Sequence, residues 1–226
     1  MKNRFRIKTC PRLLRDGQTG KGGFVSAWLF ASFLVLLLGG CSTYVVSIKY
    51  ESTGQFVANA PGQVMATVGS FTDERGEDSD WLGDLKGGPG NSVKTLRTQK
   101  PIKEMVEAAF ADALRVRNML GTKENSKVAI EGKIMRFDCN YYVNREAHAY
   151  LRVNVVVLPS RALLFSNMYR TDKNEWGLAA GMLGEAYQIA GFAQTTLNET
   201  IDKALSDPRF IEAMLNPQKI NVTSSP

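Results

Sequence analysis

Apolar and polar positions along the chain form one long apolar run at residues 24–41 and then follow the two periods of strands and helices. Alternation with a period of two, which is typical of half-buried strands, predicts five strands. These strands are expected at residues 43–50, 63–71, 127–137, 147–158 and 161–171, and an extended chain that leads away from the membrane is the alternative for residues 43–50. Residues 72–100 are rich in acids and glycines and predict an acidic loop followed by a sharp turn, with no strand.

Two segments have apolar residues at the three- and four-residue spacing of an amphipathic helix. The first helix is predicted to begin at Pro101, where the missing N–H costs nothing, and to end at Gly121. The second is predicted to end near residue 205, and Asp207 is expected to cap a brief last helix that starts at Pro208. The apolar stripe of the first helix consists of Ile102, Met105, Val106, Ala109, Phe110, Ala113, Val116 and Leu120.

The order of these elements predicts an α+β fold. We expect a two-layer domain in which a mostly antiparallel sheet carries two amphipathic helices packed on one face. The short turn at Pro159 and Ser160 predicts that the last two strands form an antiparallel hairpin. The roughly 185 residues that follow the apolar run suffice for one domain with its own hydrophobic core.

The apolar run predicts a membrane-targeting segment. Seven basic residues and one acidic residue precede Cys41, as in the cationic leader of a signal peptide. The run ends in Leu38, Gly39, Gly40 and Cys41, which resemble the lipobox of bacterial lipoproteins. By this resemblance the leader is cleaved after Gly40, and Cys41 receives fatty acyl chains such as palmitate. The alternative is an uncleaved membrane helix, but residues 24–40 fall short of the roughly 20 apolar residues that a span needs.

These signals divide the chain into four parts. They predict a lipoprotein signal peptide at residues 1–40, a lipid anchor and linker at 41–62, an α+β periplasmic domain at 63–215 and a disordered tail at 216–226. Ser42 follows the cysteine, whereas lipoproteins retained in the inner membrane tend to have aspartate there. The resemblance therefore implies an anchor in the outer membrane that faces the periplasm, with anchoring in the inner membrane as the alternative.

The formal net charge of +6 belongs to the leader. Of the 28 basic and 22 acidic residues, seven basic and one acidic precede Cys41, so the remainder carries 21 of each. A neutral domain has no excess of cations with which to release counterions from phosphates. We therefore expect no nucleic-acid partner.

Candidate catalytic groups are few. The chain has one histidine, His148, and Cys139 is the cysteine that remains once the leader and Cys41 are set aside, so the mature chain has no internal disulfide. A buried, inert thiol is expected at Cys139, because His148 has no evident triad companion. The sequence also contains no GxSxG or HExxH motif. We therefore expect a protein that is not an enzyme and has no cofactor.

The acidic stretch at residues 73–84 leaves one enzymatic alternative open. Oxygen ligands spaced two apart suit Ca²⁺, and Asp73, Glu77 and Asp80 would be the acids of a metal- or carboxylate-dependent envelope hydrolase. However, the stretch lacks the central glycine and the closing glutamate of an EF-hand loop. A solvated loop without a metal is the expectation.

Residues 176–192 combine small and apolar residues with few charges. As a loop this segment would expose a patch that meets a membrane or a partner, and as a helical extension it would be packed. Tyr141 and Tyr142 lie between two predicted strands, and they either contact a partner or cover the core. The candidate contact surface consists of Trp176, Leu178, Met182, Leu183, Tyr141 and Tyr142.

Several stretches together resemble the YajG-like family of uncharacterised bacterial lipoproteins. They are the lipobox and the sequences VGSFTDERG, PIKEMVEAAFADALRVRNML and REAHAYLRVNVVV. The element order is also similar to that of the auxiliary lipoproteins of ABC-type lipid transporters. The resemblance implies an envelope location and a binding or assembly role, and it brings no catalytic residues with it. The expected partners are the membrane, through Cys41, and an envelope protein, lipid or wall fragment.

Overall fold

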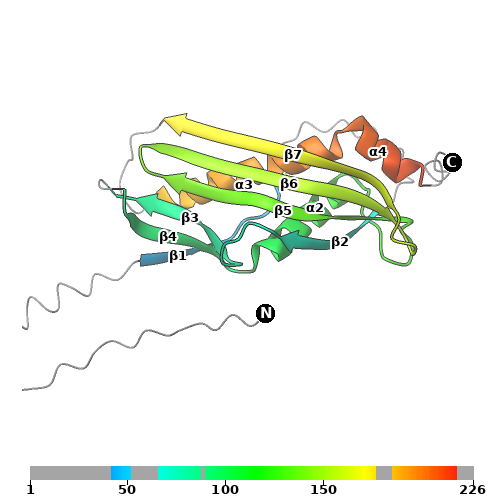
Figure 1. The fold of residues 1–226 in the computed structure, drawn as a ribbon, viewed down its shortest axis with the longest axis horizontal. Coiled ribbons are helices and arrows are strands. Elements are labelled where there is room, and N and C mark those ends of the chain that lie inside the picture. The colour runs from blue at the N-terminus through cyan, green and yellow to red at the C-terminus, as the bar shows by residue number, and fades with distance from the viewer. Residues whose placement is uncertain (1–41, 52–65, 88–89, 177–184, 218–226) are drawn as a thin grey trace, which may run out of the picture. The chain divides into compact units, whose positions relative to one another are not determined.

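The computed structural model describes residues 42–51, 66–87, 90–176 and 185–217. These residues form a seven-stranded sheet and three helices, an α+β fold (Figure 1). The elements are β1 (Ser42–Val46), β2 (Ala66–Asp73), β3 (Trp81–Lys86), β4 (Ser92–Thr98), α2 (Ile102–Val116), β5 (Val128–Tyr141), β6 (Asn144–Val157), β7 (Leu163–Trp176), α3 (Glu185–Leu205) and α4 (Pro208–Leu215). No helix among them is long and apolar enough to cross a membrane.

The sheet is open and mixed. Its strands lie in the order β1-β4-β3-β5-β6-β7, and β2 pairs with the amino-terminal half of β5 while β3 pairs with its carboxyl-terminal end. The long β5–β6 and β6–β7 pairings and the β3–β4 pairing are antiparallel. The pairings of β1 with β4, β2 with β5 and β3 with β5 are parallel.

Both predicted amphipathic helices lie on the same face of the sheet (Figure 1). Helix α2 buries the predicted stripe from Ile102 to Ala113, but it ends at Val116 and not at Gly121, and Val116 is exposed. Helix α3 buries its own stripe, which includes Leu197 and Ile201. Alternate side chains of β6 point into the same core, from Ala147 to Val155. Complete burial of a large aliphatic side chain contributes about 1.5–3 kcal/mol. The predicted two-layer α+β fold is confirmed.

The sequence-based expectation for residues 72–100 was wrong in one respect. The chain turns at Gly87 and Asn91 as expected, but the turn joins two strands, β3 and β4. The alternation in β4 is misleading, because Val93 is exposed and Lys94 is buried. The Lys94 Nζ lies 4.9 Å from the ring centroid of Tyr44 on β1. This cation–π contact stabilises Lys94 at a buried position, where an alternating pattern would predict an apolar residue.

The strand β1 belongs to the sheet. It pairs with β4 over all five of its residues, and Val46, Ile48 and Tyr50 join the core. The Tyr50 hydroxyl donates to Asp202 of α3 at 2.7 Å, and Arg117 pairs with the same carboxylate at 2.9 Å. The folded domain therefore includes the residues that directly follow Cys41.

Candidate functional site

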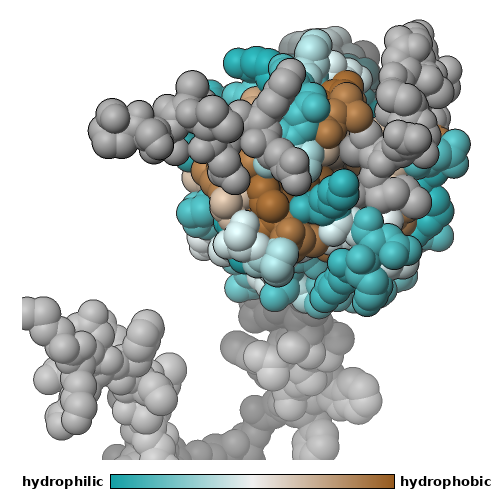
Figure 2. Space-filling model, turned by 90° about the vertical axis from the view of Figure 1, so that its right-hand side faces the viewer, coloured by the Kyte–Doolittle hydropathy of each residue, from teal (hydrophilic) through white to brown (hydrophobic). Residues whose placement is uncertain are grey.

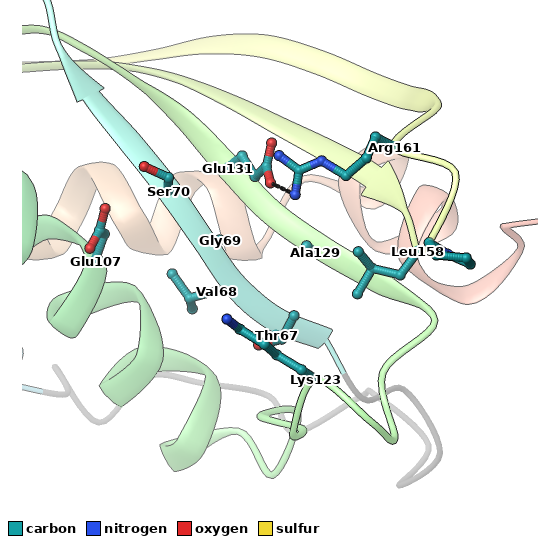
Figure 3. A pocket seen from close by; sticks show the side chains of 11 residues that line it. Thr67, Val68, Gly69, Ser70, Glu107, Lys123, Ala129, Glu131, Leu158 and Arg161 are labelled. Atoms are coloured by element: carbon teal, nitrogen blue, oxygen red, sulfur yellow. Dashed lines mark ion pairs between the residues drawn. The ribbon is translucent and has the colours of Figure 1, made fainter.

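An open groove of about 610 Å³ lies along β2 (Figure 3). Its walls come from β2, β5, α2, Lys123 and the turn between β6 and β7. Figure 3 shows Glu131 and Arg161 on one side of β2, and Glu107, Val68 and Lys123 on the side toward α2. The lining residues are Thr67, Val68, Gly69, Ser70, Glu107, Lys123, Ala129, Glu131, Leu158, Pro159 and Arg161.

The strand β2 is irregular where it forms the groove. Its register with β5 shifts between Val68 and Phe71. The Phe71 N–H donates to Glu107 Oε1 of α2 at 2.8 Å, so a helix side chain accepts the backbone donor. Among the described residues, β5 is the strand that pairs with β2. The groove therefore lies at a sheet edge that a helix covers in part.

Gly69 has no side chain and so leaves room for an ion pair beside β2. A Cβ atom at Gly69 would lie 2.6 Å from both Cγ and Oε1 of Glu131, so that carboxylate packs directly against the β2 backbone. Arg161 Nη1 lies 2.5 Å from Glu131 Oε1 (dashed in Figure 3). The Glu131 side chain is 16% exposed, whereas Arg161 is 59% exposed. The acid is thus held in the wall, and the guanidinium faces solvent.

These contacts decide what the groove can bind. Glu107 and Glu131 are engaged by a backbone N–H and by an arginine. Arg161 and Lys123 are exposed, and a guanidinium carries five N–H donors of which the ion pair uses only part. Val68, Ala129 and Leu158 supply apolar lining. The arrangement suits a ligand with an apolar body and an anionic group.

Figure 2 looks onto the end of the molecule that carries α4 and the β6–β7 turn in Figure 1. Apolar residues gather in the middle of this end, and polar residues ring them. The groove opens toward the same end, because its lining includes Leu158 and Pro159 of that turn. A concave site bordered by apolar surface is typical of a binding region.

The structure places the predicted acidic residues against arginines. Asp73 accepts two bonds of 2.8 Å from Arg75, and Asp80 pairs with Arg97 at 2.5 Å. Arg97 also binds Asp78 at 2.8 Å, and Glu77 lies exposed in the loop. In the part of the chain that the structure describes, no group of three His, Cys, Asp or Glu residues could hold a metal ion.

The predicted buried thiol is confirmed. Cys139 is free and fully buried, and burial raises the pKa of its thiol above the ordinary value. It lies opposite Ala147 on β6, whereas His148 lies opposite Asp138. Adjacent residues of a strand point to opposite faces, so Cys139 and His148 are on different faces of the sheet. They do not form a nucleophile–base pair.

The open face of the sheet carries a polar ladder that sequence analysis missed. Arg136, Tyr150 and Arg170 lie side by side on β5, β6 and β7, with each guanidinium within 5.6 Å of the Tyr150 ring centroid. The Tyr150 hydroxyl donates to Asp172 at 2.5 Å, and His148 Nδ1 lies 2.6 Å from the same oxygen. These two bonds hold the pKa of Asp172 below its ordinary value. The polar alternation in β6 was the available signal.

The predicted contact residues separate into three groups. Tyr141 ends β5 and is partly buried against the core. Tyr142 and Trp176 are 48% and 75% exposed. The others fall outside the described residues, as does the lipobox: Leu178, Met182, Leu183, Leu38, Gly39, Gly40 and Cys41.

No family model and no curated protein matches the chain. Among solved structures, it is similar to protein XCC0632 from Xanthomonas campestris, described as a DUF330 protein, with a TM-score of 0.57 and 13% identity over 77% of this chain and 99% of that one. This likeness shows a shared fold.

Two lesser likenesses are to proteins described as lipoproteins. A candidate lipoprotein from Caulobacter crescentus has 15% identity and a TM-score of 0.37, over 49% of this chain and 80% of that one. Lipoprotein GNA1162 from Neisseria meningitidis has 7% identity and a TM-score of 0.23, over 57% and 96%. The similar structures thus include uncharacterised bacterial proteins and lipoproteins.

Proposed function

We propose that the protein is a lipid-anchored, non-catalytic binding module of the bacterial cell envelope. One observation carries the proposal: β1 begins at Ser42, the residue after the cysteine that the lipobox-like sequence marks for acylation. Cleavage before Cys41 would leave every described element intact. A chain that begins at Cys41 would therefore keep β1 and the core residues that follow it, Val46, Ile48 and Tyr50.

The proposed anchor is strong enough to be permanent. Burial of an acyl chain gives about 0.8 kcal/mol per CH₂, so one chain holds weakly and two or three hold stably. Ser42 in place of aspartate favours the outer membrane and a domain that faces the periplasm. The resemblance to YajG-like lipoproteins, and in element order to auxiliary lipoproteins of ABC-type lipid transporters, supports the same location.

The groove along β2 is the proposed ligand site. Its exposed cations and apolar lining favour an apolar ligand that bears an anionic group, on an envelope lipid, protein or wall fragment. The described carboxylates of the acidic stretch support binding rather than hydrolysis, because Asp73, Asp78 and Asp80 are bound to arginines. No acid–base pair is therefore poised at these residues.

Lipid labelling tests the anchor. Wild-type protein grown with radioactive palmitate should carry label and fractionate with the outer membrane, and Cys41→Ala should lose both properties. Cys139→Ala is the matched control, because its thiol is fully buried, and it should keep the label. Label that persists in Cys41→Ala would disprove the anchor.

Crosslinking tests the groove. A photoreactive amino acid at Ser70, an exposed groove residue, should capture a ligand in intact envelopes, and Arg161→Glu should reduce the adduct. The control position is Ser166, which is exposed on β7 outside the groove. Equal adducts at both positions would show that the groove is not the binding site.

A further inference from the structure

The strand register places the start of β1 at one end of the sheet. Ser42 lies opposite Lys94 of β4, which lies opposite Leu85 of β3, and Leu85 lies opposite Tyr141 of β5. The same row continues through Arg145 of β6, next to the Asn144–Trp176 pair of β6 and β7. This row crosses every strand of the sheet except β2, at the left in Figure 1. We call it the β1-start end.

Exposed apolar and aromatic side chains gather at the β1-start end. Tyr142 and Val143, in the turn between β5 and β6, are 48% and 49% exposed. Trp176, the last residue of β7, is 75% exposed, and Val93 at the start of β4 is 43% exposed. Tyr187 is 70% exposed in the first turn of α3, which begins at this end as well. Tryptophan and tyrosine are enriched where proteins meet the membrane–water interface.

A tether at Cys41 would hold this end close to a bilayer. Consecutive Cα atoms are about 3.8 Å apart, so the Cys41 Cα lies within that distance of Ser42. An acylated Cys41 would therefore have its lipid at the first residue of the sheet, with no linker between them. Without a linker between Cys41 and β1, the folded domain would stay close to the membrane surface.

We propose that the β1-start end rests on the bilayer surface, with Trp176, Tyr142 and Val143 in its interfacial region. This inference rests on the proposed acylation of Cys41 and adds the orientation of the domain. A recess of about 390 Å³ at this end is lined by Lys86, Glu146, Tyr142, Val143, Asn140 and Asn144. Its lysine and glutamate offer both signs of charge, which suits zwitterionic head groups.

The orientation has a consequence for the groove. Strand β7 runs from Leu163, beside the turn that lines the groove, to Trp176 at the membrane. Its 14 residues span about 44 Å at roughly 3.4 Å per residue. The groove would therefore face away from the bilayer, toward partners in the aqueous compartment.

Fluorescence quenching by lipids tests the orientation. The full lipidated protein is reconstituted in vesicles of phosphatidylethanolamine and phosphatidylglycerol that contain phospholipids brominated on their acyl chains. The emission lost in Trp176→Phe isolates the Trp176 signal from that of Trp81. A second variant, Trp176→Phe with Leu163→Trp, moves the reporter to the other end of β7, at a side chain that is 58% exposed.

The expected result is loss of most of the Trp176 emission in brominated vesicles and an unchanged emission from tryptophan at position 163. An unquenched Trp176 in vesicle-bound protein would overturn the orientation, and so would equal quenching at both positions. Flotation of the vesicles tests the anchor separately. Protein that fails to float would refute the proposed acylation rather than the orientation.

Discussion

Arg75 is predicted to be the most costly charged residue to remove from the domain. Its side chain is 3% exposed and binds both oxygens of Asp73 at 2.8 Å. It also donates to the carbonyls of Trp81 at 2.8 Å, Phe137 at 3.0 Å and Asp78 at 3.2 Å. One guanidinium thus joins β2, β3, β5 and the acidic loop.

Replacement Arg75→Met keeps the length of the side chain and removes every one of these bonds. Breaking a buried ion pair by removing one partner costs about 3–5 kcal/mol, because the other charge is left uncompensated. The Asp73 side chain is 17% exposed, so we expect the lower part of that range, about 3 kcal/mol. The double variant with Asp73→Asn should be less destabilised than Arg75→Met alone.

Denaturant unfolding of the domain measures the effect as a fall in midpoint at unchanged slope. The control is Arg115→Met, since Arg115 is 62% exposed and pairs with Asp112 one turn away on α2, and we expect a loss below about 0.5 kcal/mol. A loss below about 1 kcal/mol in Arg75→Met would refute the structural role of the acidic loop. Ca²⁺ that raises the melting temperature of wild-type protein would favour the metal alternative instead.

Three further predictions concern the core and the alkaline range. Gly83→Ala should lower the free energy of unfolding by about 3 kcal/mol or more, because its Cβ would lie 1.6 Å from the carbonyl oxygen of Cys139. Thermal unfolding measures the loss, and a melting temperature like that of wild type would contradict the β3–β5 contact. Phe110→Ala should lower the free energy of unfolding by about 3–5 kcal/mol, since the side chain is fully buried. Denaturant unfolding measures this loss, and a loss smaller than that of an exposed control would count against this core. Burial and the bond to Asp202 raise the pKa of Tyr50 from near 10 to about 12. The unfolded state therefore loses this proton first, so the stability present below pH 10 should fall as the pH rises toward 12. Unfolding curves measured against pH should show this fall in wild type and not in Tyr50→Phe. An equal fall in the variant would rule Tyr50 out as the cause.

The fold was predictable where periodicity and burial agree. The strand β6 alternates between buried and partly exposed residues over most of its length, and α2 buries most of its predicted apolar stripe, so these residues alone identified both layers. The pattern failed in β4, because Lys94 is buried against Tyr44 while Val93 faces solvent. It also failed for the parallel pairings, which join segments far apart in the chain and leave no local signal.

The candidate site was less predictable than the fold. Glu131 and Arg161 are 30 positions apart in sequence and meet only because the β6–β7 turn folds back over β5 beside Gly69. The acids of the predicted loop looked like candidate ligands, since nothing in the sequence shows that Arg75 and Arg97 neutralise them. In both cases the role of the charged residue depends on its partner in the folded structure, and the sequence composition does not identify that partner.

An acylated cysteine directly attached to the first strand is proposed to begin the mature chain. Mass spectrometry of the amino-terminal peptide of protein purified from envelopes measures this most directly. We expect a peptide that starts at Cys41 and carries a diacylglyceryl group on sulfur and an acyl group on nitrogen. A peptide that retains the leader, with an unmodified thiol at position 41, would contradict it.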